Sequence, residues 1–424
     1  GRVLALGAVL FAGVVVVSGL LFLAIPRFQL ENSMLLDRFI SKKAKTGFSD
    51  TIRFGDVTEI QQDNRLALTV DVSDPKQVPA SPYWRMFVLD DYRDGTFRLS
   101  PLLRNSAFSG IERSGQRLVG EERPRRGAPV RWTFYLEPGV SRYLPLLGRF
   151  ETLQFNEAQN FRVAPALNVI ALRNEPVSMT AYRVENMVLS DRLPDPQFAA
   201  LWQARRRDAP GRPFFLGLTL SEPDRILLSR WVTEIASGGP ARTSPQALTA
   251  TEFSRRAGAW LRERHNYSLT PRIPPSEGDP LVRWLGSREG GHCELFAGSL
   301  AMLARSAGFP ARVVTGFKGG SWNGYSGNFT IRYAEAHAWT EIFDAGSGVW
   351  LRADPLEASD VTQAGDARGE AALARRLDRS WSARLDSLRV FWYRRIVSFD
   401  QRAQAETLAA LKDVTQSSGK QLRQ

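Results

Sequence analysis

The chain has 424 residues, of which 43% are apolar and 24% charged, and its formal net charge at pH 7 is +12. This length and apolar content suffice for two folded domains and exclude a predominantly disordered protein. The positive charge comes mostly from arginines spread along the chain, without a helix-turn-helix or zinc-knuckle pattern, so we expect no nucleic acid partner. Such a basic excess also suits a protein that lies against an anionic membrane surface.

Residues 1–26 are predicted to form one transmembrane helix. Val3–Ile25 runs for 23 residues without a charged side chain, enough for a helix to cross a hydrocarbon core of about 30 Å. A signal peptide would have a shorter apolar region of about 7–15 residues. A fully buried core helix is the other alternative, but the length of the stretch together with its all-round hydrophobicity favours the membrane. The chain begins at Gly1 rather than methionine, and we expect it to be part of a longer protein.

Residues 27–195 are predicted to form a juxtamembrane segment followed by an antiparallel β domain. After a polar stretch to residue 50, short alternating runs rich in Val, Phe, Tyr and Trp are separated by Gly, Pro, Asn and Asp. A period of two is typical of strands with one buried face. The predicted strands are "NRLALTVDV", "YWRMFVLDDY", "VRWTFYLEP", "NVIALRN" and "MTAYRVENMVL". A Pro-rich linker follows at residues 196–223.

Residues 224–358 are predicted to form an α+β core. Helical periodicity in "EPDRILLSRWVTEIA" and "TATEFSRRAGAWLRERHNYSL" precedes a helix that begins at Cys293 and ends at Gly308. Four strands follow: "ARVVTGF", "NFTIRY", "HAWTEIFD" and "VWLRAD". A helix packed on an antiparallel sheet is an α+β arrangement.

Residues 359–424 are predicted to include a C-terminal amphipathic helix. Apolar side chains recur at three- and four-residue intervals from Leu377 to Phe399, with arginines on the other faces. Such a helix could pack on the β domain or lie at the membrane interface, and the pattern favours neither.

Cys293 is the only cysteine, so no internal disulfide can form. It lies at the start of a predicted helix, where the macrodipole and unsatisfied backbone amides favour thiolate over thiol. The same amides could stabilise a developing oxyanion. A lone cysteine is nevertheless more often a buried small side chain than a catalyst, so the rest of the sequence has to decide its role.

His337 and Asp354 are the candidate partners of this thiol. His337 opens one predicted strand, and Asp354 ends the next, after a tight turn at 345–348. Adjacent antiparallel strands bring the start of one beside the end of the other, so we expect the two side chains to meet. A nucleophile, a base and an orienting carboxylate form a catalytic triad. The other histidines, His265 and His292, form no zinc-ligand spacing with the cysteine, and we expect neither metal nor cofactor.

Three blocks of the sequence resemble the transglutaminase-like core: "GHCELFAGSLAMLARSAGFPARVVTGF", "AEAHAWTEIF" and "GVWLRADP". This papain-like cysteine fold implies that Cys293 is the nucleophile, His337 the general base and acid, and Asp354 the orienting residue. The preceding β-rich region is similar to that of bacterial membrane-anchored transglutaminase-like proteins. Phe97 stands where that resemblance leads us to expect tryptophan, which we interpret as a difference in β-domain packing. No calcium loop of the Asp-x-Asp-x-Asp kind is present.

The resemblance implies a membrane-anchored cysteine enzyme that acts on protein or peptide substrates, including cell-wall peptides, through a thioester. An amine acceptor would give acyl transfer, and water would give deamidation or proteolysis. We expect the catalytic region to face the periplasm or cell exterior from the inner membrane. The alternative is a catalytically silent scaffold or binding module at the cell envelope. A papain-like protease or a cell-wall hydrolase fits the order of Cys and His but not their spacing or third member.

Overall fold

The computed structural model describes residues 2–24, 51–52, 60–93, 95–101, 113–122, 129–208, 216–238, 248–357 and 377–392. The chain divides into two compact units. The larger runs from Lys45 to Arg379, and the smaller is formed by Gly1–Ala44 together with Ser380–Gln424.

A nine-stranded sheet forms the β-rich part of the larger unit. Its order is β10-β9-β11-β7-β2-β16-β15-β19, with β6 also paired to β9. Only the β15–β19 pair is parallel among the described pairs of this sheet. The strands are β2 (Leu66–Val72), β6 (Arg113–Val119), β7 (Arg131–Leu136), β9 (Thr152–Ala164), β10 (Val169–Leu172), β11 (Thr180–Glu185), β15 (Ser321–Asn323), β16 (Asn328–Arg332) and β19 (Leu377–Asp378).

A five-stranded antiparallel sheet carries the candidate site, in the order β13-β18-β17-β14-β3. Its strands are β3 (Tyr83–Leu89), β13 (Arg192–Pro194), β14 (Ala311–Lys318), β17 (Ala336–Asp344) and β18 (Val349–Ala353). Helix α9 (Cys293–Ser306) packs against β17, where Thr340 Oγ1 donates to the carbonyl of Ala297 at 2.8 Å. This helix-on-sheet layer confirms the predicted α+β core.

Smaller elements complete the β-rich part. β1 (Thr51–Ile52), β5 (Thr96–Arg98) and β4 (Asp91–Arg93) form a three-stranded sheet, and β12 (Val188–Leu189) pairs with β8 (Gly148–Arg149). Three 3₁₀ turns lie in the connections: η1 (Pro75–Gln77), η2 (Pro165–Leu167) and η4 (Tyr333–Glu335).

Strand pairing crosses the predicted boundary between β domain and core in both directions. β3 comes from the first half of the chain, yet it pairs with β14 at the edge of the five-stranded sheet. β16 comes from the second half, yet it pairs with β2 in the nine-stranded sheet. Every residue of β3 is buried, because both faces of this strand are covered, and its expected alternation is therefore absent. The division at residues 195, 223 and 358 stays a prediction.

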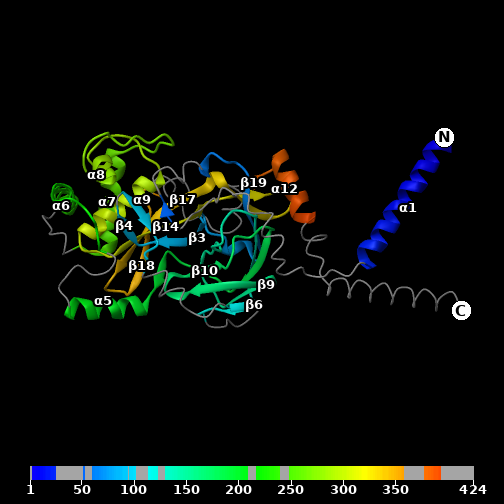
Figure 1. The fold of residues 1–424 in the computed structure, drawn as a ribbon, viewed down its shortest axis with the longest axis horizontal. Helices are drawn as coiled ribbons and strands as arrows, with labels where there is room; N and C mark the ends of the chain where they lie inside the picture. Colours follow the sequence, from blue (N-terminus) through cyan, green and yellow to red (C-terminus); the bar gives the residue numbers. More distant parts are fainter. Residues whose placement is uncertain are drawn as a thin grey trace. The chain divides into compact units, whose positions relative to one another are not determined.

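Helices gather at one end of the larger unit, as Figure 1 shows for α6, α7, α8 and α9. Their bounds are α5 (Pro196–Asp208), α6 (Glu222–Ser237), α7 (Ala250–Arg264) and α8 (Pro280–Leu285). Ser221, Thr249 and Asp279 cap α6, α7 and α8 by accepting from backbone N–H groups of the first turn. The predicted linker at 196–223 thus begins with a helix, α5.

Phe97 of β5 packs against α9 rather than only within the β-rich part. A Cβ added at Gly298 of α9 would lie 3.2 Å from the Phe97 ring, and the Arg305 guanidinium lies 5.6 Å from the centre of that ring. The residue that departs from the expected tryptophan therefore contacts the helix that carries Cys293. Because Gly298 has no side chain, the Phe97 ring fits against α9 at this position.

The smaller unit contains α1 (Arg2–Ala24) and α12 (Trp381–Trp392). No helix in the described part of the chain has the length and apolar character required to cross a membrane. The transmembrane helix predicted over residues 1–26 is therefore not confirmed. The polar segment at 27–50 and the tail from 393 onward, both given roles in the sequence prediction, lie outside the described residues.

Candidate active site

Asp354 is the centre of a hydrogen-bonding group beside the end of β18. Its Oδ2 lies 2.8 Å from His337 Nε2 and accepts from the Tyr83 hydroxyl at 2.8 Å and from Lys318 Nζ at 3.2 Å. Its Oδ1 accepts from the backbone N–H of Leu356 at 3.0 Å. The antiparallel pairing of β17 with β18 brings His337 and Asp354 together, which confirms the predicted proximity.

The surroundings of Asp354 keep it ionised. Burial by itself would raise the pKa of this carboxyl, but the charges and hydrogen bonds of His337, Lys318 and Tyr83 hold it well below its usual range. The Tyr83 hydroxyl shows the opposite effect, since burial and the Asp354 charge raise its pKa well above the ordinary value. Tyr83 therefore stays neutral and donates to the carboxylate.

Cys293 is the first residue of α9 and is fully buried. Burial raises the pKa of its thiol, and the charges of Glu294 and Asp354 act in the same direction. The backbone N–H groups of Ala338 and Glu294 oppose this effect without overcoming it. Desolvation thus acts against the thiolate that the helix start is expected to favour. A neutral thiol needs a base to remove its proton.

The backbone on both sides of His337 contacts the groups around the thiol. The Ala338 N–H is near Cys293 Sγ, and the Ala336 carbonyl accepts a hydrogen bond from Gln61 Nε2 at 2.6 Å. Among the described residues, no hydrogen bond joins the Cys293 thiol directly to the His337 ring. The His337 ring stacks on Trp339, with centroids 6.2 Å apart. Because Nε2 faces Asp354, Nδ1 is the ring nitrogen that is not engaged by this carboxylate.

Gln61, which precedes β2, was not identified from the sequence. Its Nε2 lies 3.9 Å from Cys293 Sγ, and its Oε1 accepts from the Tyr267 hydroxyl at 3.3 Å. Burial raises the pKa of Tyr267 to about 12, so this hydroxyl remains a donor. No sequence signal marks Gln61, because it lies 232 residues from Cys293 along the chain.

The sequence analysis also did not identify Tyr83 and Lys318 as site residues, although strand pairing could have indicated Lys318. Gly316 is the register partner of His337 in the β14–β17 pair, so Lys318, two residues further on, faces the same side of the sheet as Gly316. Pairing the two predicted strands could thus have placed Lys318 near His337. Tyr83 required knowledge that β3 joins this sheet.

The other two histidines have structural contacts. His292 caps α9: its Nδ1 accepts from the Glu294 N–H at 3.2 Å, and burial lowers its pKa to about 4. His265 stacks on Trp284 with centroids 3.9 Å apart, and burial lowers its pKa as well. Within the part of the chain that the structure describes, no group of three or more His, Cys, Asp or Glu side chains could hold a metal ion.

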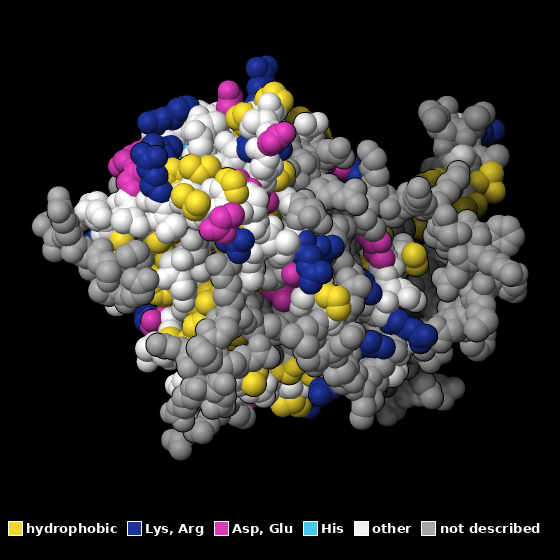
Figure 2. All heavy atoms as spheres, turned by 60° about the vertical axis from the view of Figure 1, so that its left-hand side comes forward, with side chains coloured by type: hydrophobic (Ala, Val, Ile, Leu, Met, Phe, Trp, Pro, Cys, Tyr) yellow, Lys and Arg dark blue, Asp and Glu magenta, His cyan; other side chains and the backbone are white. Residues whose placement is uncertain are grey.

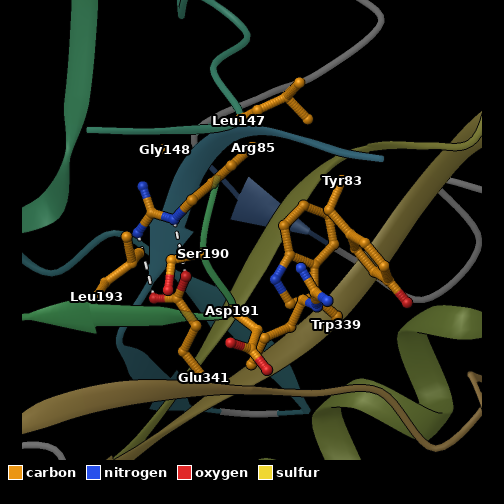
Figure 3. Close-up of a pocket in the computed structure, with 10 residues that line it drawn as sticks. Tyr83, Arg85, Leu147, Gly148, Ser190, Asp191, Leu193, Trp339 and Glu341 are labelled. Carbon is orange, nitrogen blue, oxygen red and sulfur yellow. Dashed lines mark hydrogen bonds and ion pairs between the residues drawn. The ribbon is translucent and has the colours of Figure 1, made fainter. Parts of the chain in front are cut away.

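Two cavities lie apart from the thiol. The first, of about 20 Å³, is lined by Tyr83, Arg85, Trp339 and Glu341 among others (Figure 3) and has room for about one water molecule. Beside it Glu341 bonds Arg85 and Arg312. The second, of about 530 Å³, adjoins Arg305 and Gly308, at the opposite end of α9 from Cys293. Cys293 is not among the residues that line either cavity.

Comparison with protein families matches two parts of the chain. Residues 1–188 match the family described as TgpA N-terminal domain, and residues 240–355 match the transglutaminase-like superfamily. The second range contains Cys293, His337 and Asp354.

Individual relatives are more distant. A protein-glutamine gamma-glutamyltransferase of Pseudomonas aeruginosa is 26% identical over 341 residues, which cover 79% of this chain and 44% of that protein. An uncharacterized Bacillus subtilis protein, YebA, is 30% identical over 90 residues, which cover 20% of this chain and 12% of that protein. This chain thus spans less than half the length of the curated relatives it matches.

Two crystal structures of the periplasmic domain of TgpA from Pseudomonas aeruginosa share the fold. The form bound to ethylmercury superposes with a TM-score of 0.53 at 20% identity, covering 75% of this chain and 99% of that domain. The second has a TM-score of 0.51 at 22% identity, covering 78% and 100%.

Proposed function

Because the chain joins a TgpA N-terminal domain to a transglutaminase-like core, we propose that it is a cysteine acyl-transfer enzyme acting on glutamine side chains of proteins. In this proposal Cys293 is the nucleophile, His337 the general base and acid, and Asp354 the residue that orients and stabilises the imidazole. The observation that carries this proposal is the 2.8 Å contact between His337 Nε2 and Asp354. Both residues and Cys293 lie in the range that matches the transglutaminase-like superfamily.

The proposed chemistry uses the neutral thiol that burial favours. His337 takes the Sγ proton as sulfur attacks the carboxamide carbon, and the carbonyl electron pair moves to oxygen. Ammonia then leaves with the proton that His337 held, and a thioester remains on Cys293. Asp354 would stabilise the imidazolium that exists between these steps.

We propose an amine as the main acceptor of this acyl group. The glutamyltransferase name of the Pseudomonas relative supports transfer, whereas water as acceptor would give deamidation or peptide hydrolysis from the same thioester. A catalytically silent scaffold would have no need for a buried carboxylate that three neighbouring groups keep ionised. We therefore rank the scaffold function second.

We also propose that the chain is membrane-anchored, with its catalytic region in the periplasm. Support comes from the match to the TgpA N-terminal domain from residue 1, from the likeness to a periplasmic domain and from the uncharged Val3–Ile25 stretch. Protein or cell-wall peptide is the proposed substrate class. On the face shown in Figure 2, basic and acidic side chains are interspersed with apolar ones, which agrees with a protein partner rather than a polyanion.

The decisive experiment compares wild type with Cys293→Ala on casein and a fluorescent amine. We expect amine incorporation by wild type and none by the variant, because the chain has no second thiol. Mass spectrometry of the casein distinguishes incorporated amine, deamidated glutamine and cleaved peptide.

Ser306→Ala provides a matched control, since Ser306 is exposed at the far end of the same helix, and it should retain full activity. Equal product from wild type and Cys293→Ala would contradict the proposal. Deamidation without incorporation would reassign the acceptor to water.

A further inference from the structure

The first turn of α9 has few free amides for an oxyanion. The N–H groups of Leu295 and Phe296 both donate to the carbonyl of His292, at 3.0 and 3.2 Å. The Glu294 N–H donates to His292 Nδ1 at 3.2 Å. His292 therefore engages three of the donors that the sequence pattern offered to a reacting carbonyl, while the N–H groups of Glu294 and of Ala338 on β17 also approach Cys293 Sγ. Of this turn, the Cys293 N–H is the remaining backbone donor.

The Gln61 carboxamide supplies a donor directed at the thiol. One Nε2 hydrogen is used by the Ala336 carbonyl at 2.6 Å, and the amide also donates toward Cys293 Sγ at 3.9 Å. The Tyr267 hydroxyl bonds Oε1, which fixes which end of the amide carries the hydrogens. Both ends of the side chain are therefore held, and the second Nε2 hydrogen faces the reaction centre.

The distances suit an oxyanion better than a sulfur. When Sγ bonds to a carbonyl carbon, the oxygen lies one bond beyond that carbon, and an N–H···O⁻ bond spans about 2.7–2.9 Å. A donor 3.9 Å from Sγ is within reach of that oxygen. Because the thiol is fully buried, such a donor acts where water does not compete, which strengthens its effect.

We propose that Gln61 is a catalytic residue that donates its second Nε2 hydrogen to the oxyanion formed when Cys293 attacks the substrate carbonyl. This inference rests on the proposed function and adds a residue from the β-rich part of the chain to the site. As the S–C bond forms, the thiol proton passes to His337 and the C=O electron pair moves to oxygen, which Gln61 stabilises. When the C=O bond re-forms, the leaving group departs with the proton from His337.

The test compares two reactions of Cys293 in the full chain. Acetylation by p-nitrophenyl acetate passes through an oxyanion, whereas alkylation by iodoacetamide does not. We expect Gln61→Ala to slow acetylation about 10²–10³-fold, the usual effect of losing one oxyanion donor, and to leave alkylation unchanged. Gln61→Glu, which keeps the size but loses the N–H, should slow acetylation at least as much.

The control is Gln116→Ala, which changes an exposed glutamine on β6 and should alter neither rate. If both rates fall together for Gln61→Ala, Gln61 is structural and the inference is wrong. If both rise, Gln61 only shields the thiol, and the inference is again wrong.

The two proposals fail in different ways. If wild type incorporates no amine into casein but is acetylated, and Gln61→Ala slows acetylation alone, the proposed function is wrong and the role of Gln61 stands. If wild type incorporates amine and Gln61→Ala acetylates normally, the role of Gln61 is wrong and the function stands. A wild-type thiol that is alkylated but never acetylated would overturn both.

Discussion

At the scale of single residues, the arrangement around Asp354 is more elaborate than a triad. Lys318 and Tyr83 donate to the same oxygen that faces His337. The carboxylate is thereby held in one position by donors from three strands, β3, β14 and β17, and its charge is partly balanced before any imidazolium forms. Lys318 is therefore a positioning residue in this interpretation, and its contribution can be measured through stability.

Lys318→Met should destabilise the protein at pH 7 by about 1.5–3 kcal/mol, the usual worth of a hydrogen bond to a charged group. The folded pKa of Asp354 is depressed, so its ionisation stabilises the fold above the ordinary pKa of about 3.9, and this stability is lost as pH falls through the folded pKa. The difference between wild type and variant should therefore shrink only as pH falls through the depressed folded pKa of Asp354, because the unfolded-state pKa is common to both proteins. Urea unfolding at pH 7 and at the lowest pH at which both proteins remain folded measures it.

Lys318→Arg keeps the charge and serves as the control, with a much smaller change expected. A deficit that is the same at both pH values would mean that Lys318 acts through packing rather than through the Asp354 charge.

At the scale of elements, the N-terminus of α9 depends on a histidine cap. His292 is fully buried and accepts from the Glu294 N–H, so it has to be neutral to serve as acceptor. Its Nε2 lies 3.4 Å from the Glu294 carboxylate. This cap links the position of Cys293 to pH, and it agrees with the helix-entry role that the sequence suggested for His292.

Because of His292, the free energy of unfolding should decrease by about 2–3 kcal/mol as pH falls from 6.5 to 4.5. Its folded pKa, about 4, lies below the ordinary 6.5, so the unfolded chain binds the extra proton in this window and stability falls as pH decreases. His292→Asn keeps a strong N-cap without titrating, and its unfolding free energy should vary less over the same window. Parallel pH profiles for the two proteins would refute this assignment.

Glu341 joins three strands through a buried pair of ionic contacts. It lies on β17 and bonds Arg85 of β3 at 2.8 Å and Arg312 of β14 at 2.7 Å. Burial would raise the pKa of Glu341, but the two arginines lower it to about 2. Figure 3 shows Arg85 and Glu341 directed toward each other and joined by dashed lines, and β14 lies between their strands in the sheet.

Glu341→Gln should destabilise the protein by about 3–5 kcal/mol, because two buried guanidinium groups would lose their carboxylate. Glu185→Gln breaks the Arg131–Glu185 pair, in which the arginine side chain is 53% exposed, and should cost less than about 1 kcal/mol. Chemical unfolding of both variants gives the comparison. Equal losses would contradict the view that Glu341 is a buried strand link.

At the scale of the whole molecule, the β-rich part and the five-stranded sheet form one compact unit, Lys45–Arg379. Each sheet contains a strand from the other half of the chain. Tyr83 and Gln61 also reach the site from the first half. We therefore expect that the two matched families do not fold as two independent units.

A fragment of residues 224–358 should show no cooperative unfolding, since β14 and β16 would lose their partners β3 and β2 and expose unpaired edges. Residues 45–379 should unfold in a single transition. Thermal unfolding followed by circular dichroism checks both. A sharp transition for the short fragment would show that the core folds alone.

The sequence by itself determined the local elements and the candidate catalytic residues. Periodicity placed the helix at Cys293 and the strands around His337 and Asp354, because a hydrophobic pattern depends only on neighbours along the chain. The two-strand hairpin was enough to predict that His337 and Asp354 meet. Their catalytic roles, together with that of Cys293, stay predictions until the variants are measured.

Only the tertiary structure showed which residues surround the candidate triad and how deeply the thiol is buried. Gln61 and Tyr83 reach the site across 232 and 271 residues of chain, through strand pairings that local patterns do not specify. The helix start predicted a thiolate, but the depth of burial, which depends on all the elements packed around α9, raises the thiol pKa instead. Desolvation and long-range contacts are properties of the folded chain, so the sequence pattern could name a candidate nucleophile but not its environment.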